Sequence, residues 1–206
     1  INYIVNNGGK VVVLSHLGKV KSESDFVNNS LSVVYERLKE LVDFELSFCP
    51  YTDFDVVKSS VLNVSYGSGI LLENTRFYDV PDKLESGCSD TLSLFYASLG
   101  DIFINDAFGT IHRGHASNCG IAKYLDSGIG FLVMDEISNL SRLDDPVRPF
   151  VVIMGGAKLS DKLGVISSLI ERVDYLLIGG AMSYTFLKAK GYNVGKCLYE
   201  EEYVSY

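Results

Sequence analysis

The sequence predicts an α/β fold in which parallel sheets are flanked by helices. Short apolar runs of strand length alternate with longer segments in which apolar residues recur at helical spacing. Such alternation is typical of βαβ units, whose strands are parallel. The first run, Val11–Leu14, has no polar alternation and is expected to be buried on both faces. Polar residues and glycines follow several runs, at the edge where open α/β sheets bind ligands.

The predicted elements follow one another in a regular order. The strands are expected at Val11–Leu14, Glu45–Cys49, Ile70–Leu72, Asp101–Asn105, Phe150–Met154 and Tyr175–Ile178. The helices are expected at residues 31–42 with Ser30 as the N-cap, and at Asp53–Leu62, Ser89–Leu99, Met134–Leu143, Lys162–Val173 and Met182–Lys190.

A domain boundary is expected near the segment LDDPVRPF, where two prolines follow a helical pattern. We therefore expect a first α/β domain over residues 1–133. Residues 134–148 would form an interdomain helix and hinge. Residues 149–206 would begin a second α/β domain, which the sequence contains only in part.

Composition excludes several classes of function. The 206 residues carry a formal net charge of -8, which argues against a nucleic-acid surface. No apolar run approaches the ~18 residues of a membrane span. The cysteines Cys49, Cys88, Cys119 and Cys197 are widely spaced, so the sequence suggests neither a zinc site nor a disulfide framework. Reduced thiols in a cytoplasmic protein are the simplest interpretation.

Polar clusters that follow the predicted strands are candidate ligand sites. They are Ser15–Lys19, Glu73–Phe77, Asn105–His115 and Gly155–Lys162. If the first three share one sheet edge, His16, Lys19, Arg76 and Arg113 converge and would bind an anion that carries phosphate and carboxylate groups. Each residue alone could also be a solvated loop residue. For His112 and His115 a structural hydrogen bond is the favoured role.

The segment GGAKLSDKLG is a second candidate site. It lacks the order of residues of a P-loop. Its two glycines would let the backbone approach a ligand, and a helix beginning near Ser160 would offer free N–H groups to a phosphate. Lys158 and Lys162 would share one face if both were helical. The alternative, that both lysines are simply solvated, is equally compatible with the spacing.

Several blocks of the sequence resemble the phosphoglycerate kinase family, in its bacterial form. They are SHLG, LLENTRF, SLGDIFINDAFGTIHRGHASN, RPFVVIMGGAKLSDK and LIGGAMSYTFLKAKGYNVGK, and the resemblance runs from residue 1 to residue 206. It implies two α/β domains that face a cleft. It also implies reversible phosphoryl transfer between 1,3-bisphosphoglycerate and ADP, which gives 3-phosphoglycerate and ATP with Mg²⁺. A cytoplasmic monomer that binds neither nucleic acid nor membranes is expected.

The resemblance also assigns roles to individual residues. The phosphoglycerate-binding positions correspond to His16, Leu17, Gly18, Lys19, Arg76 and Arg113. The nucleotide-binding positions correspond to Gly155, Gly156, Lys158, Lys162 and Gly180. Lys162 is the expected catalytic residue, because it matches the lysine that contacts the transferring phosphoryl group. No metal ligand is assigned, since the family's metal-ligating loop has no counterpart in this sequence.

The sequence departs from the family pattern at several points. Lys19 replaces the usual arginine, and Ala181 replaces the usual third glycine. The amino-terminal strand motif with the catalytic arginine that follows it, and most of the second domain, have no counterpart, so we expect this chain alone to be inactive. The alternative function is a non-catalytic anion-binding or interaction fragment. A dinucleotide-dependent dehydrogenase is disfavoured, because no GxGxxG follows a predicted strand.

Overall fold

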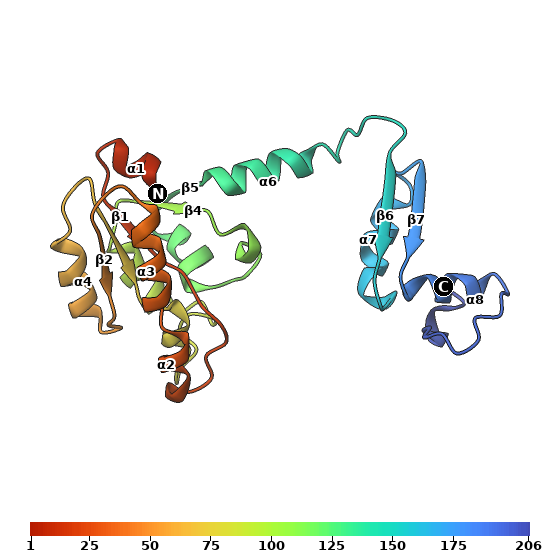
Figure 1. Ribbon diagram of the computed structural model, residues 1–206, viewed down its shortest axis with the longest axis horizontal. Helices are drawn as coiled ribbons and strands as arrows, with labels where there is room; N and C mark the ends of the chain where they lie inside the picture. Colours follow the sequence, from red (N-terminus) through yellow and green to blue (C-terminus); the bar gives the residue numbers. More distant parts are fainter. The chain divides into compact units, whose positions relative to one another are not determined.

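The structure is a computed structural model that describes all 206 residues. It divides into two compact units, Ile1–Ile137 (unit 1) and Ser138–Tyr206 (unit 2). Each unit contains parallel strands with helices packed against them, as the sequence predicts (Figure 1). Helix α6 (Phe131–Ser141) contains the point at which the units divide.

Unit 1 is built on a three-stranded parallel sheet in the order β1-β3-β2. The strands are β1 (Val11–Val13), β2 (Leu46–Cys49) and β3 (Gly69–Leu72), and Val11 and Leu46 both lie opposite Gly69. All four residues of β3 are buried, as expected for a central strand. A second parallel pair joins β4 (Ile102–Asn105) to β5 (Asp126–Ile129). The predicted strands of this unit are confirmed, whereas β5 was missed, because its sequence, DSGI, has a single apolar residue.

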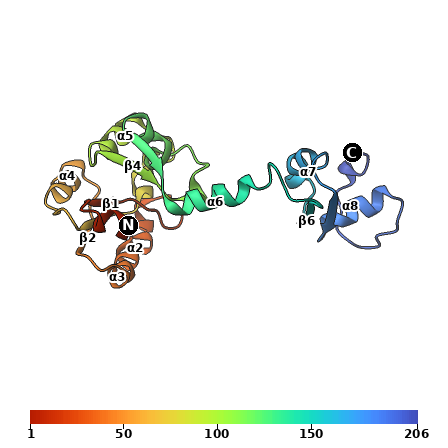
Figure 2. The same ribbon diagram turned by 90° about the horizontal axis from the view of Figure 1, so that it is seen from above.

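Helices cover both faces of the three-stranded sheet (Figure 2). On one face, α3 (Ser32–Leu41) packs through Tyr35, whose ring stacks on Phe48 of β2 with centroids 5.4 Å apart. On the other face, α4 (Phe54–Leu62) and α5 (Asp90–Ala97) meet through stacked rings of Phe54 and Phe95. The buried core on that side is formed by Cys49, Val57, Val61, Ile70, Leu72, Leu92, Phe95, Tyr96, Ala97, Leu99, Ala116 and Ile121.

The start of α3 differs from the prediction that Ser30 is its N-cap. The helix begins at Ser32, so that Leu31 occupies the cap position. The buried carboxylate of Glu73, which follows β3, accepts hydrogen bonds from the Leu31 amide and the Ser30 hydroxyl, both at 2.7 Å. The Ser30 hydroxyl still accepts from the Ser32 amide at 3.2 Å. A side chain distant in the sequence therefore fixes this helix start, and the local pattern could not show it.

Unit 2 has the same layered construction on a smaller scale. Strands β6 (Val151–Gly155) and β7 (Tyr175–Gly179) are parallel, and α7 (Leu163–Leu169) and α8 (Met182–Ala189) follow them. The buried side chains Leu159, Ile166 and Met182 form the core of this unit. Other side chains of the strands face outward, such as Ile153, which is 79% exposed. The predicted helix Lys162–Val173 is shorter than expected, because the chain turns after Leu169.

The beginning of α6 also lies earlier than predicted. The helix starts at Phe131 rather than Met134, and a carboxylate oxygen of Asp106 accepts a hydrogen bond from the Val133 amide in its first turn. The remaining short helical segments are α1 (Asn2–Asn6), α2 (Phe26–Asn29), Glu23–Asp25, Thr75–Asp79, Phe108–Thr110, Ala116–Gly120, Ile121–Lys123, Ser160–Lys162 and Glu201–Tyr203.

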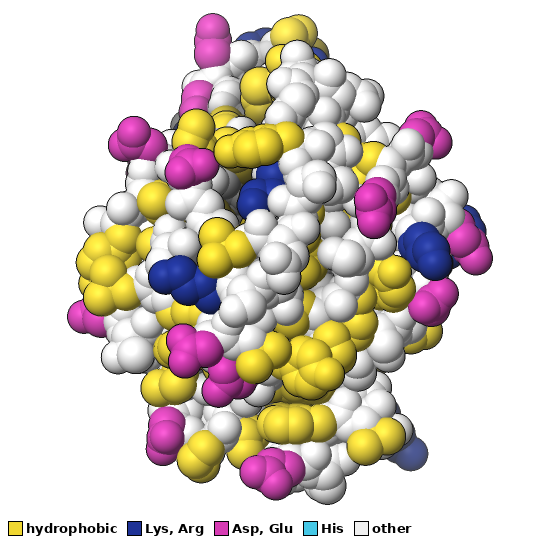
Figure 3. Space-filling model, turned by 90° about the vertical axis from the view of Figure 1, so that its left-hand side faces the viewer, with side chains coloured by type: hydrophobic (Ala, Val, Ile, Leu, Met, Phe, Trp, Pro, Cys, Tyr) yellow, Lys and Arg dark blue, Asp and Glu magenta, His cyan; other side chains and the backbone are white.

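None of these helices combines the length and the apolar character needed to cross a membrane. Figure 3 shows one face of the molecule, on which Asp and Glu side chains are scattered among apolar ones and no His side chain is visible. The Lys and Arg side chains on this face are few and separate, so they form no broad basic surface there.

Candidate functional site

Two polar loops meet at the carboxyl edge of the three-stranded sheet. One follows β1 and contains His16, and the other follows β3 and contains Arg76. They are neighbours because β1 and β3 are paired and parallel. The Thr75 amide donates a hydrogen bond of 3.1 Å to the Ser15 carbonyl, which joins the loops directly. The loop after β1 turns at Gly18, whose φ of +63° is a conformation that favours glycine.

Arg76 is held in place by a carboxylate of its own loop. One of its terminal nitrogens lies 3.4 Å from a carboxylate oxygen of Asp79. The other oxygen of Asp79 accepts a hydrogen bond of 2.7 Å from the Ser86 amide, which fixes the carboxylate itself. The Nε atom of Arg76 is buried and has no hydrogen-bond partner in the structure. The guanidinium is thus positioned by the protein but only partly satisfied by it.

Arg113 lies in a loop whose backbone is organised by Asn118. The side-chain amide of Asn118 donates hydrogen bonds to the carbonyls of Thr110, Ile111 and Arg113, at 3.2, 3.0 and 2.7 Å. Its own oxygen accepts from the side chain of Asn105, at the end of β4, at 2.6 Å. A single side chain therefore fixes the loop that presents the exposed Arg113.

Electrostatic coupling shows that these loops share one environment. The pKa of His16 is lowered from its ordinary value, first by burial and then by the positive charges of Arg76 and Arg113. The pKa of His115 is lowered by the same causes in the same order. These mutual effects place the charges of His16, His115, Arg76 and Arg113 near one another, whereas no such effect supports the expectation that Lys19 joins them. Lys19 is exposed in the loop after β1.

Glu85 is a buried carboxylate beside this cluster, and no sequence pattern indicates its burial. Its oxygens accept hydrogen bonds from the amide (3.1 Å) and the hydroxyl of Ser117, and Nδ1 of His115 lies 3.7 Å away. Burial raises the pKa of Glu85 to about 7, although the hydrogen bonds from Ser117 oppose the shift. The residue stands in a polar segment, KLESGCSD, which reads as an exposed loop.

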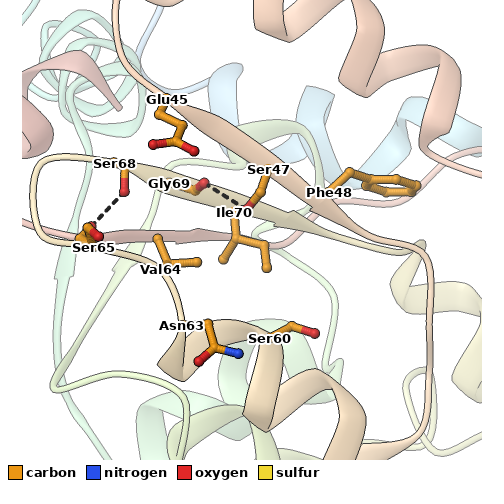
Figure 4. Close-up of a pocket in the computed structure, with 10 residues that line it drawn as sticks. All are labelled: Glu45, Ser47, Phe48, Ser60, Asn63, Val64, Ser65, Ser68, Gly69 and Ile70. Carbon is orange, nitrogen blue, oxygen red and sulfur yellow. Dashed lines mark hydrogen bonds between the residues drawn. The ribbon is translucent and has the colours of Figure 1, made fainter.

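A hollow of unit 1 lies elsewhere. A cavity of about 270 Å³ is lined by Glu45, Ser47, Phe48, Ser60, Asn63, Val64, Ser65, Ser68, Gly69 and Ile70 (Figure 4). Glu45 and Gly69 place it at the amino ends of β2 and β3, away from His16 and Arg76. Its lining contains a carboxylate and hydroxyl groups but no Lys or Arg, so it is not suited to an anion.

The second candidate site lies at the carboxyl edge of the strands of unit 2. Gly155 of β6 lies opposite Gly179 of β7, and Gly156 and Gly180 follow them. Gly180 has a φ of +68°, and a Cβ atom there would lie only 2.9 Å from the Gly156 carbonyl oxygen. The Met182 amide donates to that same carbonyl at 3.0 Å. This edge is thus bare backbone, which a ligand can approach closely.

The lysines of this segment are exposed, as the alternative of solvated lysines has it, and the helix start differs from the expectation. Lys158 lies outside the helical turn that begins at Ser160, so it does not share a helical face with Lys162. Two N–H groups at the helix start are not free, because the Glu200 carboxylate accepts hydrogen bonds from the amides of Leu159 and Ser160. Glu200 also accepts from the Ser160 hydroxyl at 2.7 Å, and these bonds lower its pKa. The Glu200 side chain thus binds two amides that were expected to be available to a phosphate.

In neither unit are three or more His, Cys, Asp or Glu side chains grouped so that they could hold a metal ion.

Known proteins match the chain along its whole length. The family model described as phosphoglycerate kinase matches residues 1–206. A phosphoglycerate kinase of Mesomycoplasma hyopneumoniae is 50% identical over 204 residues, which are 98% of this chain and 50% of the relative. One from Macrococcus caseolyticus is 51% identical over 203 residues, 98% of this chain and 51% of the relative. The chain thus spans about half the length of the curated relatives it matches.

Solved structures agree with these matches. The structure of phosphoglycerate kinase from Coxiella burnetii has a TM-score of 0.84 and 35% identity, and the match covers 98% of this chain and 49% of that chain. The enzyme from Pyrococcus horikoshii has a TM-score of 0.74 and 29% identity, over 94% of this chain and 48% of that chain.

Proposed function

Because the chain belongs to the phosphoglycerate kinase family, we propose that it carries the phosphoglycerate site and the first part of the nucleotide site of such an enzyme. The reaction is the reversible transfer of a phosphoryl group between 1,3-bisphosphoglycerate and ADP, in the cytoplasm. Residues 1–133 form the phosphoglycerate domain, 134–148 the hinge, and 149–206 the start of the nucleotide domain.

The observation that carries this proposal is the convergence of His16, Arg76 and Arg113 in a chain of negative net charge. 3-Phosphoglycerate offers a phosphate and a carboxylate, and guanidinium groups bind both in a bidentate manner. Arg76 is held by Asp79 and keeps an unsatisfied Nε donor, as expected of a group that awaits an anion. Lys19 adds a point charge, and Leu17 and Gly18 supply the backbone of the same loop.

Phosphoryl transfer depends mainly on positioning and on neutralising the charge of the moving group. Arg76 and Arg113 hold the acid so that its carboxylate is oriented for transfer. The glycine edge formed by Gly155, Gly156 and Gly180 accommodates the nucleotide, and Lys162 neutralises the transferring phosphoryl group with Lys158 close by. Mg²⁺ would be supplied in complex with the nucleotide phosphates and would screen their charge, and no residue of this chain is assigned to hold it.

Calorimetric titration of the chain with a series of small anions tests the proposal. We expect 3-phosphoglycerate to bind more tightly than glycerol 3-phosphate, which lacks the carboxylate, and than lactate, which lacks the phosphate. Inorganic phosphate should also bind more weakly than 3-phosphoglycerate, because one anionic group cannot engage both arginines. Equal affinities across the series would show a general attraction for anions and would contradict the proposal.

The alternative, a non-catalytic anion-binding fragment, predicts no binding of MgATP by unit 2. NMR titration of the chain with MgATP distinguishes the two. The proposed role of unit 2 requires shifts at Gly155, Gly156 and Gly180 that are reduced in Lys162→Ala and kept in Lys190→Ala, an exposed lysine at the end of α8.

A further inference from the structure

Two cysteines of unit 1 lie side by side although they are 31 residues apart in the sequence. The Sγ atoms of Cys88 and Cys119 are 3.6 Å apart, and both thiols are free. Cys88 is half-buried in the loop that precedes α5, and Cys119 is exposed on the turn Ala116–Gly120. Of the other two cysteines, Cys49 is buried in the core of unit 1 and Cys197 belongs to unit 2.

The backbone around both thiols is well anchored. Cys88 has a φ of +53°, which is uncommon for a residue with a side chain, and its amide donates a hydrogen bond of 3.1 Å to the Glu85 carbonyl. The Cys119 thiol lies 3.6 Å from the His115 carbonyl oxygen, in hydrogen-bonding position. Burial raises the pKa of the Cys88 thiol, and its hydrogen bond with Cys119 acts in the same direction. The more exposed Cys119 is therefore the thiol that an external reagent reaches first.

We propose that Cys88 and Cys119 form an oxidisable dithiol, a modification site that closes to an intramolecular disulfide by exchange with a low-molecular-weight disulfide. The Cys119 thiolate attacks one sulfur of the reagent, which forms a mixed disulfide and releases one thiolate. The Cys88 thiol then loses its proton and attacks Sγ of Cys119, which releases the second thiolate. Two protein thiols are oxidised, and one reagent disulfide is reduced to two thiols.

The position of the bond gives it a structural consequence. It would tie the segment before α5 to the turn that carries Ser117 and follows His115. These residues contact the buried Glu85, whose own loop ends at Cys88. Oxidation would thus join the segments that surround Glu85 by a covalent bond, whether or not a substrate is bound.

The test is incubation of the native chain with excess oxidised glutathione, followed by thiol titration and peptide mapping by mass spectrometry. We expect the wild type to lose two thiols and to yield one linked pair of peptides, containing Cys88 and Cys119. Cys197→Ser should give the same linked pair. Cys88→Ser should instead carry glutathione on Cys119, because the resolving thiol is absent.

Three outcomes would overturn the proposal. They are glutathione adducts on the wild type with no internal link, a link that includes Cys197, and no reaction at Cys119. Cys119→Ser serves as the second variant, and it should form no internal disulfide although Cys88 remains. Circular dichroism before oxidation confirms that each variant is folded, so that a lost link is not a consequence of unfolding.

Discussion

The side-chain amide of Asn74 donates a hydrogen bond of 2.8 Å to the carbonyl oxygen of Leu17, across 57 positions of the sequence. The same nitrogen donates to the Asn29 carbonyl at 2.7 Å, and the Asn74 side chain is completely buried. One residue thus joins the loop after β1 to the loop after β3. The relative positions of His16 and Arg76 depend on this connection.

Replacing Asn74 with Ala should therefore destabilise unit 1. The change leaves two partly buried carbonyls without their partner. A fully buried unsatisfied group costs about 1–3 kcal/mol, so the loss at each carbonyl should lie below that range. Urea unfolding of the chain measures the loss, with Asn28→Ala as a control, because Asn28 is exposed on α2. If the two variants unfolded at the same urea concentration, the connecting role of Asn74 would be wrong.

Replacing Asn118 with Leu should loosen the loop that presents Arg113. Leucine has a similar size but cannot donate to the carbonyls of Thr110, Ile111 and Arg113. We expect faster hydrogen exchange of the amides of Thr110 and Arg113 and weaker binding of 3-phosphoglycerate, while β1 and β3 keep their protection. Asn63→Leu, at the end of α4, is the control. Unchanged exchange in the Arg113 loop would refute the role of Asn118.

Glu85 should make the stability of unit 1 depend on pH. Its pKa is about 7 in the folded state and 4.5 as the ordinary value, so the folded state binds the proton more tightly. The free energy of unfolding should thus fall as the pH rises from about 4.5 to 7, by up to ~3 kcal/mol at 1.36 kcal/mol per pKa unit. Glu85→Gln, which mimics the protonated form, should remove this decline.

Urea unfolding at pH 5.5 and pH 8 measures the effect, as the difference between wild type and variant. Glu36→Gln, an exposed glutamate of α3, is the matched control and should retain the wild-type decline. An identical decline in wild type and Glu85→Gln would show that Glu85 does not titrate in this range.

Binding of an anion should reduce the downward pKa shifts of His16 and His115. Arg76 and Arg113 contribute to lowering both values, and a bound phosphate neutralises these charges. NMR titration should therefore give higher pKa values for both residues with 3-phosphoglycerate than without it. By linkage, affinity should increase as the pH falls through the range in which these histidines titrate. If the pKa values of both histidines stayed the same when 3-phosphoglycerate was added, the anion would bind away from Arg76 and Arg113.

The sequence was sufficient to predict elements whose signal is local. The apolar runs identify β1, β3 and β7, and the helical spacing of apolar residues identifies α4 and α8. Strand β5 was missed because DSGI has almost no apolar content. It is a strand because it pairs with β4, and the local sequence does not show that pairing.

The candidate site was predictable where a charged residue follows a strand, as with His16 and Arg76. It was not predictable where a distant side chain decides the outcome. Glu73 accepts a hydrogen bond from the Leu31 amide at the start of α3, which no local capping rule indicates. Glu200 accepts from the Ser160 amide, which was expected to be free. Glu85 is the clearest case, because only the packing of the Ser117 turn buries it. Each of these contacts joins residues at least 32 positions apart.

The most direct test of the central claim is calorimetric titration of 3-phosphoglycerate into the wild type, Arg76→Ala and Arg113→Ala at low salt. Arg37→Ala, on the exposed surface of α3, is the control for a simple change of charge. Since a hydrogen bond to a charged group contributes about 1.5–3 kcal/mol, each site variant should bind at least ~10-fold more weakly, and the control should bind as the wild type does. Equal affinities for the wild type and both site variants would contradict the account.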